Sequence, residues 1–299
     1  MRNQAAEIGL AIIGGGRVGL FRGEVANRHP AVKWIGLAEK NPNRAGEVAP
    51  RVGADFVTQS HVELLKRPEV TCAIIATDEH LHVDPIMVAV ERGIPLLIEK
   101  PLATDLAQSA KVLKAIKDAK VDAVVGYTQR FRRKWLAGKE KVRTNALGDV
   151  TLVTSRAFMN RLVAIDNYKR TDDPKTISPM VISGTHALDM CMWYLEAKTP
   201  VECYARSVDK VLGPLYQGID ATAGMIMMSD GCIYHLNISW ALPVTWPGAV
   251  YSLEVGITGT DGVLTIDDTH RDMVLAVSKP QSEGYAPDQS RLVDFLGRD

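Results

Sequence analysis

A glycine cluster near the start of the chain restricts the fold more than any other feature of the sequence. Gly14, Gly16 and Gly19 follow the apolar run IGLAII and precede a stretch with helical patterning. A strand, a G-x-G-x-x-G turn and a helix, in this order, form a dinucleotide-binding loop. The first glycine permits the tight turn, the second lets the backbone approach a pyrophosphate, and the third lets helix and strand pack closely. The helix N-terminus then offers unpaired N–H groups to the phosphates. We expect the cofactor to contact Gly14, Gly16, Arg17, Val18 and Gly19.

The acid that ends the second apolar run indicates which dinucleotide binds. Glu39 lies 25 residues after Gly14, about where a carboxylate would hydrogen-bond to the adenosine ribose hydroxyls. A carboxylate there repels the 2′-phosphate of NADP, so Glu39 favours NAD as the cofactor. Lys40 and Arg44 are close enough in the sequence to serve a 2′-phosphate if Glu39 points away, which keeps NADP as the alternative.

Short apolar runs alternate with helix-like stretches through the first 125 residues. Alternating strands and helices imply a parallel sheet with helices on both faces, and such strands are continuously apolar because both their faces are buried. Residues 1–125 are therefore predicted to be an α/β Rossmann domain that binds NAD(P). We expect strands at 8–13, 34–39, 73–76, 95–99 and 123–126, and helices at 18–28, 42–52, 85–92 and 106–120.

The pattern changes in the second half of the chain. The segment CIYHLNISW, residues 232–240, alternates with period two and has one mostly polar face, as in a half-exposed antiparallel strand. The turn signals at 229–231 and 259–262 lie between strand-like runs, as hairpins require. Residues 126–299 are therefore predicted to form a C-terminal α+β domain with an open, mainly antiparallel sheet and a helix at 183–195.

Composition excludes several classes of function. The chain has 299 residues, enough for about two domains, and its 46% apolar and 23% charged residues are ordinary for a soluble globular protein. Lys plus Arg equals Asp plus Glu at 35 each, so no global field attracts nucleic acid or a membrane surface. The four cysteines lie far apart and suggest neither a metal site nor a disulfide framework. The first residues match a signal peptide poorly, and we expect a cytoplasmic protein.

The segment LLIEKPLAT places a lysine where an apolar strand stops. Ligands of an open parallel sheet bind outside the carboxyl ends of its strands, so Lys100 is expected near the nicotinamide end of the cofactor. Pro101 biases Lys100 toward an extended backbone. An ordinary lysine has a pKa of about 10.4 and is a poor base at neutral pH, but desolvation and a positive nicotinamide ring lower such a pKa. The spacing alone favours the other reading, in which Lys100 is a strand-end lysine with a solvated head.

The chain contains six motifs in this order: GGGRVG, Glu39, ATDEHLH (76–82), IEKPLA (98–103), GYTQRF (126–131) and SGTHALD (183–189). Together they resemble the glucose-fructose oxidoreductase, inositol dehydrogenase and rhizopine-catabolism family of NAD(P)-dependent enzymes, over nearly the whole chain. The resemblance implies that Lys100 touches the reacting hydroxyl and that His186, on a second-domain helix, faces it. It further implies that Thr77, His82, Glu99 and Lys100 line the nicotinamide end of the cofactor. The second-domain sheet is then the subunit interface of a homodimer or homotetramer.

The chain departs from the family pattern at several positions. Ile182 replaces the aspartate that many members carry one helical turn before the histidine, so no relay through that carboxylate exists here. Asp189 lies three residues after His186 and could partner its imidazole or serve a structural role. Asp78 stands where Thr-Pro is usual and is expected to cap the helix ahead of His82. The chain also ends at DFLGRD, where relatives usually continue for some tens of residues.

A basic segment and a long loop complete the set of candidates. We interpret most of the basic residues as a solvated helix face, with Arg130 or Arg133 able to meet a carboxylate or phosphate on the substrate. The stretch 160–178 is expected to be a loop that shapes the pocket. The basic residues are Arg130, Arg132, Arg133, Lys134, Lys139, Lys141 and Arg143.

The sequence as a whole predicts an NAD-dependent oxidoreductase that moves a hydride between nicotinamide and a carbinol carbon of a sugar, a cyclitol or a similar polar small molecule. Lys100 is the expected acid/base or oxyanion anchor, and His186 its partner. Arg130 and Asp189 are expected to bind the substrate. Two alternatives remain open: NAD-assisted elimination, in which the hydride leaves and returns, and a non-catalytic NAD sensor or co-repressor.

Overall fold

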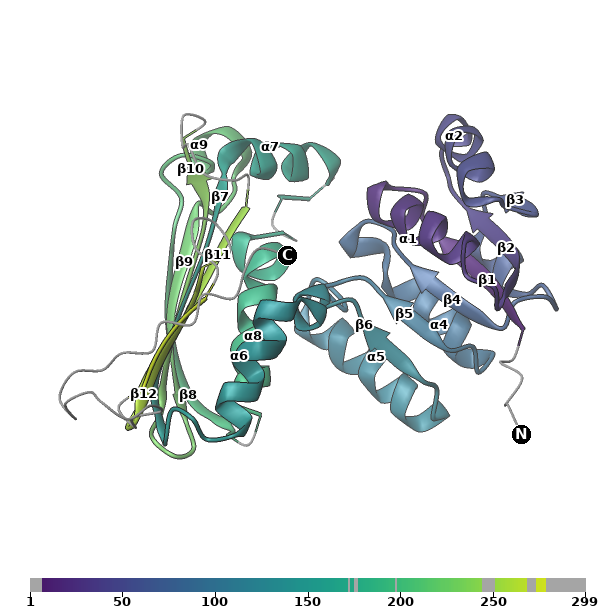
Figure 1. The fold of residues 1–299 in the computed structure, drawn as a ribbon. Coiled ribbons are helices and arrows are strands. Elements are labelled where there is room, and N and C mark those ends of the chain that lie inside the picture. The colour runs from purple at the N-terminus through teal and green to yellow at the C-terminus, as the bar shows by residue number, and fades with distance from the viewer. Residues whose placement is uncertain are drawn as a thin grey trace, which may run out of the picture. The chain divides into compact units, whose positions relative to one another are not determined.

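A computed structural model of the chain divides into two compact units, Met1–Gly126 and Tyr127–Asp299 (Figure 1). The structure describes residues 7–171, 173–174, 177–196, 198–243, 251–267 and 273–277. The division falls beside the boundary expected from the sequence.

The first unit is built on a parallel sheet of six strands in the order β3-β2-β1-β4-β5-β6. This is the strand order of a dinucleotide-binding Rossmann fold. From β1, the strands β2 and β3 follow on one side and β4, β5 and β6 on the other, so the strand order switches between β1 and β4. The strands are β1 (Ile8–Ile13), β2 (Val32–Ala38), β3 (Phe56–Thr58), β4 (Cys72–Ile75), β5 (Leu96–Ile98) and β6 (Ala123–Val125). The helices are α1 (Arg17–Asn27), α2 (Pro42–Val52), α3 (His61–Leu65), α4 (Val83–Glu91) and α5 (Leu106–Ala119), with a 3₁₀ turn, η1, at Glu79–Leu81.

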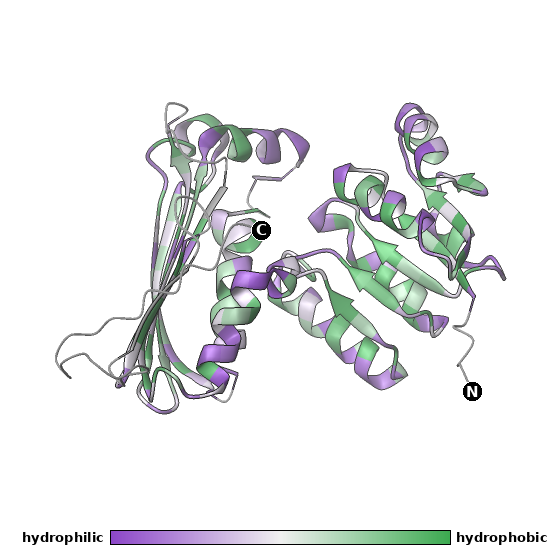
Figure 2. Ribbon diagram, in the orientation of Figure 1, coloured by the Kyte–Doolittle hydropathy of each residue, from purple (hydrophilic) through white to green (hydrophobic). Residues whose placement is uncertain are grey.

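The central strand β1 contributes to two hydrophobic cores at once. In β1, Leu10 and Ile12 pack into one cluster of buried residues, whereas Ala11 and Ile13 pack into another. Neighbouring side chains leave a strand on opposite faces, so a continuous apolar run is what a doubly covered strand requires. Figure 2 shows the strands of this unit coloured apolar along most of their length.

The predicted strands and helices of the first unit are all present, but β3 and α3 were not predicted. The strand β3 contributes only two apolar residues, Phe56 and Val57, and α3 is little more than one helical turn, so neither repeats an apolar pattern often enough to be recognised. The strand β3 pairs with β2 at the edge of the sheet, from Gly36 opposite Phe56 to Ala38 opposite Thr58.

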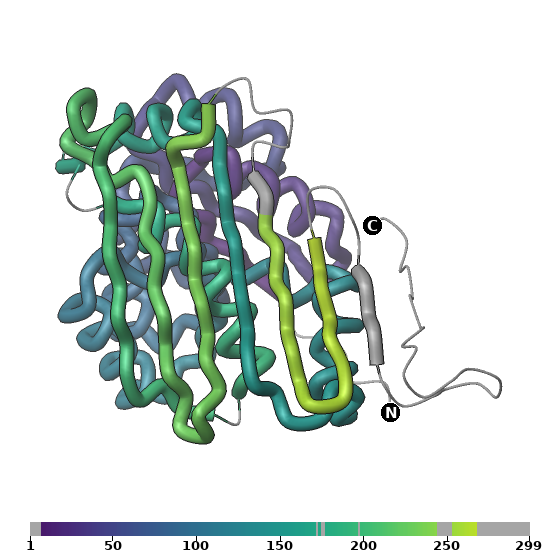
Figure 3. Tube along the Cα trace, turned by 90° about the vertical axis from the view of Figure 1, so that its left-hand side faces the viewer, coloured from purple at the N-terminus to yellow at the C-terminus, as the bar shows by residue number. Residues whose placement is uncertain are grey.

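The second unit contains a sheet of seven strands in the order β13-β12-β11-β7-β10-β9-β8 (Figure 3). All neighbours are antiparallel except β7 and β10, so the sheet is mixed. Its strands are β7 (Val150–Asn160), β8 (Pro200–Val208), β9 (Ala221–Met228), β10 (Ile233–Leu242), β11 (Tyr251–Gly259), β12 (Gly262–Asp267) and β13 (Met273–Val277). The helical segments are η2 (Thr128–Phe131), α6 (Arg133–Arg143), α7 (Arg161–Arg170), η4 (Met180–Gly184), α8 (Thr185–Tyr194) and α9 (Gly213–Tyr216).

One face of this sheet is covered by α6 and α8, whereas no described helix lies over the face turned to the viewer in Figure 3. The period-two segment predicted from the sequence lies in β10 and just before it. Its apolar positions, from Cys232 to Trp240, are all buried, and His235 on the opposite face is exposed. Both predicted hairpins are present, joining β9 to β10 and β11 to β12.

The prediction of a loop at 160–178 is wrong for its first half, which forms the helix α7. The Asn160 side chain caps this helix by accepting a hydrogen bond from the Leu162 N–H at 3.0 Å. The helix buries only Ala164 and Tyr168, so its sequence carries little helical periodicity. The final segment DFLGRD lies outside the described residues.

Candidate functional site

The glycine loop has the backbone geometry that its motif demands. Gly14 adopts a φ of +98°, and a Cβ there would lie 2.6 Å from the Ala76 carbonyl oxygen. A Cβ at Gly19 would lie 2.0 Å from the Gly14 carbonyl oxygen. By contrast, a Cβ at Gly16 would meet no protein atom within 4 Å. Gly14 and Gly19 are therefore required by the protein itself, while the space beside Gly16 is open to a ligand.

The helix that follows the loop begins without a side-chain cap. Gly16 occupies the N-cap position of α1, no side chain caps the helix, and its first turn contains no acidic residue. Gly16, Arg17 and Val18 are exposed. An eleven-residue helix with an accessible, uncapped N-terminus after a glycine turn fits a pyrophosphate.

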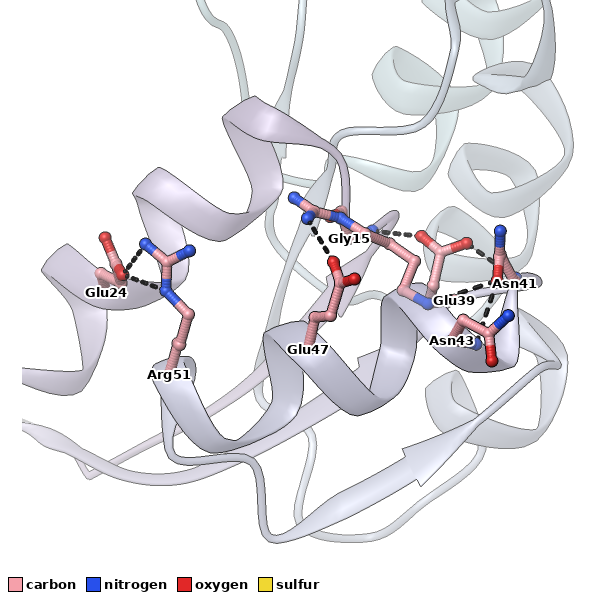
Figure 4. Close-up of polar contacts among 8 residues, drawn as sticks. Gly15, Glu24, Glu39, Asn41, Asn43, Glu47 and Arg51 are labelled. Atoms are coloured by element: carbon pink, nitrogen blue, oxygen red, sulfur yellow. Dashed lines mark hydrogen bonds and ion pairs between the residues drawn. The ribbon is translucent and has the colours of Figure 1, made fainter.

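Glu39 points back toward the glycine loop (Figure 4). Its Oε2 accepts a hydrogen bond from the Gly15 N–H at 2.7 Å, and its Oε1 accepts one from the Asn41 N–H at 2.9 Å. The carboxylate therefore lies between the end of β2 and the loop after β1. This is the place where an acid would meet an adenosine ribose.

Arg44 contacts the same glycine at its carbonyl group. Its Nε donates to the Gly15 carbonyl oxygen at 2.7 Å, and its Nη1 pairs with Glu47 at 3.0 Å. The backbone of Gly15 is thus held by an acid at its N–H and by a cation at its carbonyl group. The positive charge of Arg44 is partly neutralised by Glu47 on the same helix.

The loops after β4 and β5 are tied together by a histidine. His82 is fully buried, and its two ring nitrogens face backbone carbonyl groups: Nδ1 lies 2.8 Å from the Pro101 oxygen and Nε2 lies 3.2 Å from the Thr77 oxygen. Burial lowers the pKa of His82, against the opposite effect of these two carbonyl groups. The sequence predicted that His82 lines the nicotinamide end of the cofactor. In the structure, the described hydrogen-bond contacts of its ring are with backbone carbonyl groups of the protein.

The Thr77 hydroxyl group makes no hydrogen bond within the described part of the protein. Its oxygen atom is buried. A buried hydroxyl without a partner is costly, and a bound ligand would satisfy it. Together with the open space at Gly16, this fits a dinucleotide lying along the edge of the sheet.

The Glu-Lys-Pro segment leaves β5 beside this histidine. Glu99 is almost fully buried, and its carboxylate forms an ion pair with Arg22 of α1. A Cβ at Gly126 would lie 3.1 Å from the Glu99 carboxylate, so the glycine leaves room for the pair. Lys100 is half-buried, and the peptide bond that joins it to Pro101 is cis. The expected cofactor contacts of Glu99 and Lys100 stay predictions.

Asp78 occupies the N-cap position of η1, as expected for a helix cap. Its side chain, however, makes no capping hydrogen bond to that turn. The capping role suggested by the sequence is therefore wrong in its chemical detail, because position alone does not direct the carboxylate to the free N–H groups.

In the second unit, His186 lies in the first turn of α8 beside an aromatic residue that the sequence did not single out. The ring of Tyr127 meets the imidazole edge to face, with centroids 6.0 Å apart. The Tyr127 hydroxyl hydrogen-bonds to the Thr185 hydroxyl at 2.7 Å. Burial raises the pKa of Tyr127, so the phenol stays protonated at neutral pH. Lys100 and His186 belong to different units, and their pairing stays a prediction.

The two residues expected to bind the substrate bind each other. Arg130 donates to both carboxylate oxygens of Asp189, from Nε at 2.8 Å and from Nη2 at 2.5 Å. The Asp189 side chain is 9% exposed, and the Arg130 guanidinium also lies 5.5 Å from the centre of the Trp193 ring. The hydrogen bonds to Asp189 raise the pKa of Arg130. Such a bidentate pair is fixed in direction and close to neutral, which suits hydroxyl groups better than an anion.

Ile182 is buried in an apolar cluster with Met159, Tyr168 and Trp240. It lies in the short π-helical segment η4, directly before α8. Segments of π-helix are frequent at functional sites. The position at which the resemblance to the family predicted a carboxylate is therefore filled here by an apolar side chain that contributes to packing.

The basic segment is only partly a solvated face. Arg133 and Arg143 are exposed, as expected, but Lys134 is buried. Lys139 donates to the Trp193 carbonyl oxygen at 2.6 Å and pairs with Glu196 at 2.8 Å. Lys139 thus satisfies one carbonyl group in the last turn of α8 and pairs with a carboxylate just beyond that helix, so it has a structural role.

Four residues of these sites were not identified from the sequence. Tyr127 and Thr185 lie within the motifs GYTQRF and SGTHALD, which supplied the only available signal. Arg22 and Trp193 act through partners that are distant in the sequence, 77 residues away for Arg22 and Glu99. No helix in the described part of the chain is long and apolar enough to cross a membrane.

Two protein-family models match the chain. One, an oxidoreductase family with an NAD-binding Rossmann fold, matches residues 8–127. The other, the GFO/IDH/MocA C-terminal domain, matches residues 135–265. Together the two models account for most of the chain.

Several named proteins are similar to this chain. The scyllo-inositol 2-dehydrogenase (NAD(+)) of Bacillus subtilis (strain 168) is 22% identical over 285 residues, which cover 94% of this chain and 80% of that protein. The inositol 2-dehydrogenase of Rubrobacter xylanophilus is 26% identical over 215 residues, 70% of this chain and 58% of that protein. The solved structure of a levoglucosan dehydrogenase in complex with NADH and L-sorbose has a TM-score of 0.80 at 21% identity, over 98% of this chain and 81% of that chain. At this identity the structural likeness shows the fold.

Proposed function

Because this chain belongs to the GFO/IDH/MocA family of NAD-binding oxidoreductases, we propose that it transfers a hydride between nicotinamide and a carbinol carbon of a sugar, a cyclitol or a similar polar small molecule. Relatives named for inositols and levoglucosan support this substrate class. The near-neutral Arg130–Asp189 pair supports a substrate recognised through hydroxyl groups.

The observation that carries the proposal is the alignment of three loops along one edge of the first sheet. The strands β1, β4 and β5 are neighbours and parallel, so the loops that follow them leave the sheet at the same edge. These loops contribute, in order, the glycine turn, Thr77 and Lys100. A dinucleotide whose pyrophosphate lies at the glycine turn would extend its nicotinamide end toward Thr77 and Lys100.

Each residue then has a defined task. Bound nicotinamide would supply the acceptor or the donor of the hydride. When the carbinol carbon loses a hydride, its hydroxyl oxygen must release a proton, and Lys100 in its neutral form takes that proton; in the reverse direction Lys100 returns it. We propose His186 as the partner of Lys100, with Tyr127 fixing the direction of its ring. Arg130 and Asp189 bind the remaining hydroxyl groups of the substrate.

Replacing Glu39 with Gln is expected to shift the ratio of kcat/KM for NAD to that for NADP by about 10-fold toward NADP. The change removes the charge that repels a 2′-phosphate, while Arg44 remains beside the Gly15 carbonyl group. Initial rates with each cofactor at saturating substrate give the ratio.

Two further variants separate the causes of this shift. Glu39→Gln combined with Arg44→Ala should lose the gain for NADP if Arg44 receives the 2′-phosphate. Glu24→Gln is the matched control, because Glu24 pairs with Arg51 near the C-terminal ends of α1 and α2, at the left of Figure 4 and away from Glu39. An unchanged cofactor ratio in Glu39→Gln would contradict the assignment of Glu39.

We also propose that the uncovered face of the second sheet is a homo-oligomer interface. Tyr204 and Met225 lie opposite each other on this face and are 57% and 40% exposed. Replacing both with Glu should reduce the particle to a smaller species in sedimentation equilibrium, because charged groups would have to be buried in the interface. Leu106→Glu, at an 86% exposed position of α5, serves as the control. An unchanged mass for the double variant would contradict the proposal.

One observation favours a second function, a sensor that binds NAD without turnover. Ile182 packs into an apolar cluster at the position where the resemblance to the family predicted a carboxylate that assists the histidine. The presence of Lys100 and His186 argues against loss of the chemistry.

The decisive test is a panel of sugars, cyclitols and hydroxy acids assayed with NAD and with NADP. Stoichiometric formation of reduced nicotinamide with a polyol would support the dehydrogenase. Tight NAD binding without turnover across the panel would indicate the sensor, and release of product without net reduction would indicate NAD-assisted elimination.

A further inference from the structure

We propose that His82 is a positioning residue for Lys100: it holds the Pro101 carbonyl group and so fixes the backbone from which the lysine side chain leaves. This inference rests on the proposed role of Lys100. It assigns to His82 a task inside the protein in place of the cofactor contact expected from the sequence.

The geometry places His82 between the two loops that matter most for the proposed chemistry. His82 lies directly after the turn η1, at the N-cap position of α4, and its side chain is fully buried. The ring spans from the Thr77 carbonyl group, after β4, to the Pro101 carbonyl group, after β5. Pro101 directly follows Lys100, so a shift of its carbonyl group moves the lysine backbone as well.

The two contacts of the ring are not equivalent. A neutral imidazole has one N–H donor, and its other nitrogen cannot donate to a carbonyl group. Burial lowers the pKa of His82, and the charge of Lys100 also lowers it, whereas Glu79 and the two carbonyl groups raise it. The ring is therefore neutral near pH 7, and we assign its N–H to Nδ1, which makes the shorter contact. The hydrogen bond from Nδ1 to Pro101 is the one that holds the Lys100 segment.

This assignment distinguishes between two conservative substitutions. The amide nitrogen of Asn lies near the place of Nδ1, so His82→Asn can still donate to the Pro101 oxygen. The amide nitrogen of Gln lies near the place of Nε2 and approaches Thr77 instead. His82→Leu fills the space and donates to neither. His80→Leu, on the same turn and half-buried, is the matched control.

The experiment measures kcat, KM for NAD and the melting temperature of the full-length variants, with the best substrate of the panel. We expect His82→Leu to lower kcat by at least about 10-fold with KM for NAD within about threefold, since small misplacements of a catalytic group are costly. His82→Asn should recover most of kcat, whereas His82→Gln should not. If His82→Leu does not fold, the comparison of Asn with Gln alone decides the proposal.

The outcomes separate this proposal from the proposed function. Turnover that survives Lys100→Met would overturn the role of Lys100, and the proposal on His82 with it. Loss of turnover in Lys100→Met together with wild-type kcat in His82→Leu would overturn only the proposal on His82. Equal kcat in the Asn and Gln variants would also overturn it. If His82 had only a structural role, a donor beside the Pro101 oxygen would give no advantage in kcat over a donor beside the Thr77 oxygen.

Discussion

Replacing Lys100 with Met is expected to lower kcat by about 10²- to 10⁴-fold while NAD binds with nearly unchanged affinity. Methionine keeps the length and the apolar stem of the side chain but removes its charge and its proton. The described contacts of the glycine loop and of Glu39 do not involve Lys100, so the dinucleotide keeps the site proposed for it. Steady-state rates give kcat, and titration calorimetry gives the affinity for NAD.

Two comparison variants make the result specific. Lys100→Arg keeps a positive charge but cannot release its proton near neutral pH. It should therefore be as inactive as Met if Lys100 is an acid/base, and partly active if the lysine acts only as an electrostatic anchor. Lys111→Met, at an exposed position of α5, removes a lysine from the same unit and should leave kcat unchanged. Comparable turnover in Lys100→Met and the wild type would remove the lysine from the mechanism.

The first sheet could be predicted from the sequence because its information is local. Every strand except β3 contains an apolar run, and the glycine turn marks β1, on either side of which the strands were added in opposite directions. The parallel pairing of β7 with β10 had no such signal. A parallel pair depends on a crossover far longer than a hairpin, and nothing in the period-two pattern of β10 distinguishes one neighbour from another.

The same limit applies to the candidate site. The residues that follow β4 and β5 could be predicted as site candidates from the sequence, because ligands bind at the edge of a parallel sheet where its strands end. Their partners could not. Glu99 pairs with Arg22, 77 residues away, and Asp189 pairs with Arg130, 59 residues away. Ion pairs at such separations are set by tertiary packing, so a sequence pattern shows which groups carry charge but not which of them are already neutralised.

Replacing Gly19 with Ala is expected to destabilise the first unit by about 2 kcal/mol and to abolish NAD binding. The added Cβ would lie 2.0 Å from the Gly14 carbonyl oxygen, which is a backbone atom and cannot rotate away. Either α1 or the glycine turn must move, and overpacking of this kind typically costs about 1–3 kcal/mol. Thermal unfolding should show a fall of several degrees in the melting temperature.

Gly16→Ala is expected to weaken NAD binding without changing the stability of the fold. A Cβ at Gly16 would meet no protein atom within 4 Å, and the residue has an extended backbone with φ of −62°. The melting temperature should therefore stay within about 1 °C of the wild type, whereas the Kd for NAD should rise at least about 10-fold, because the methyl group fills the space where a pyrophosphate approaches the backbone. Unchanged affinity would mean that the phosphates do not lie against this turn. A loss of affinity at constant stability would locate them there, since no protein atom competes for that space.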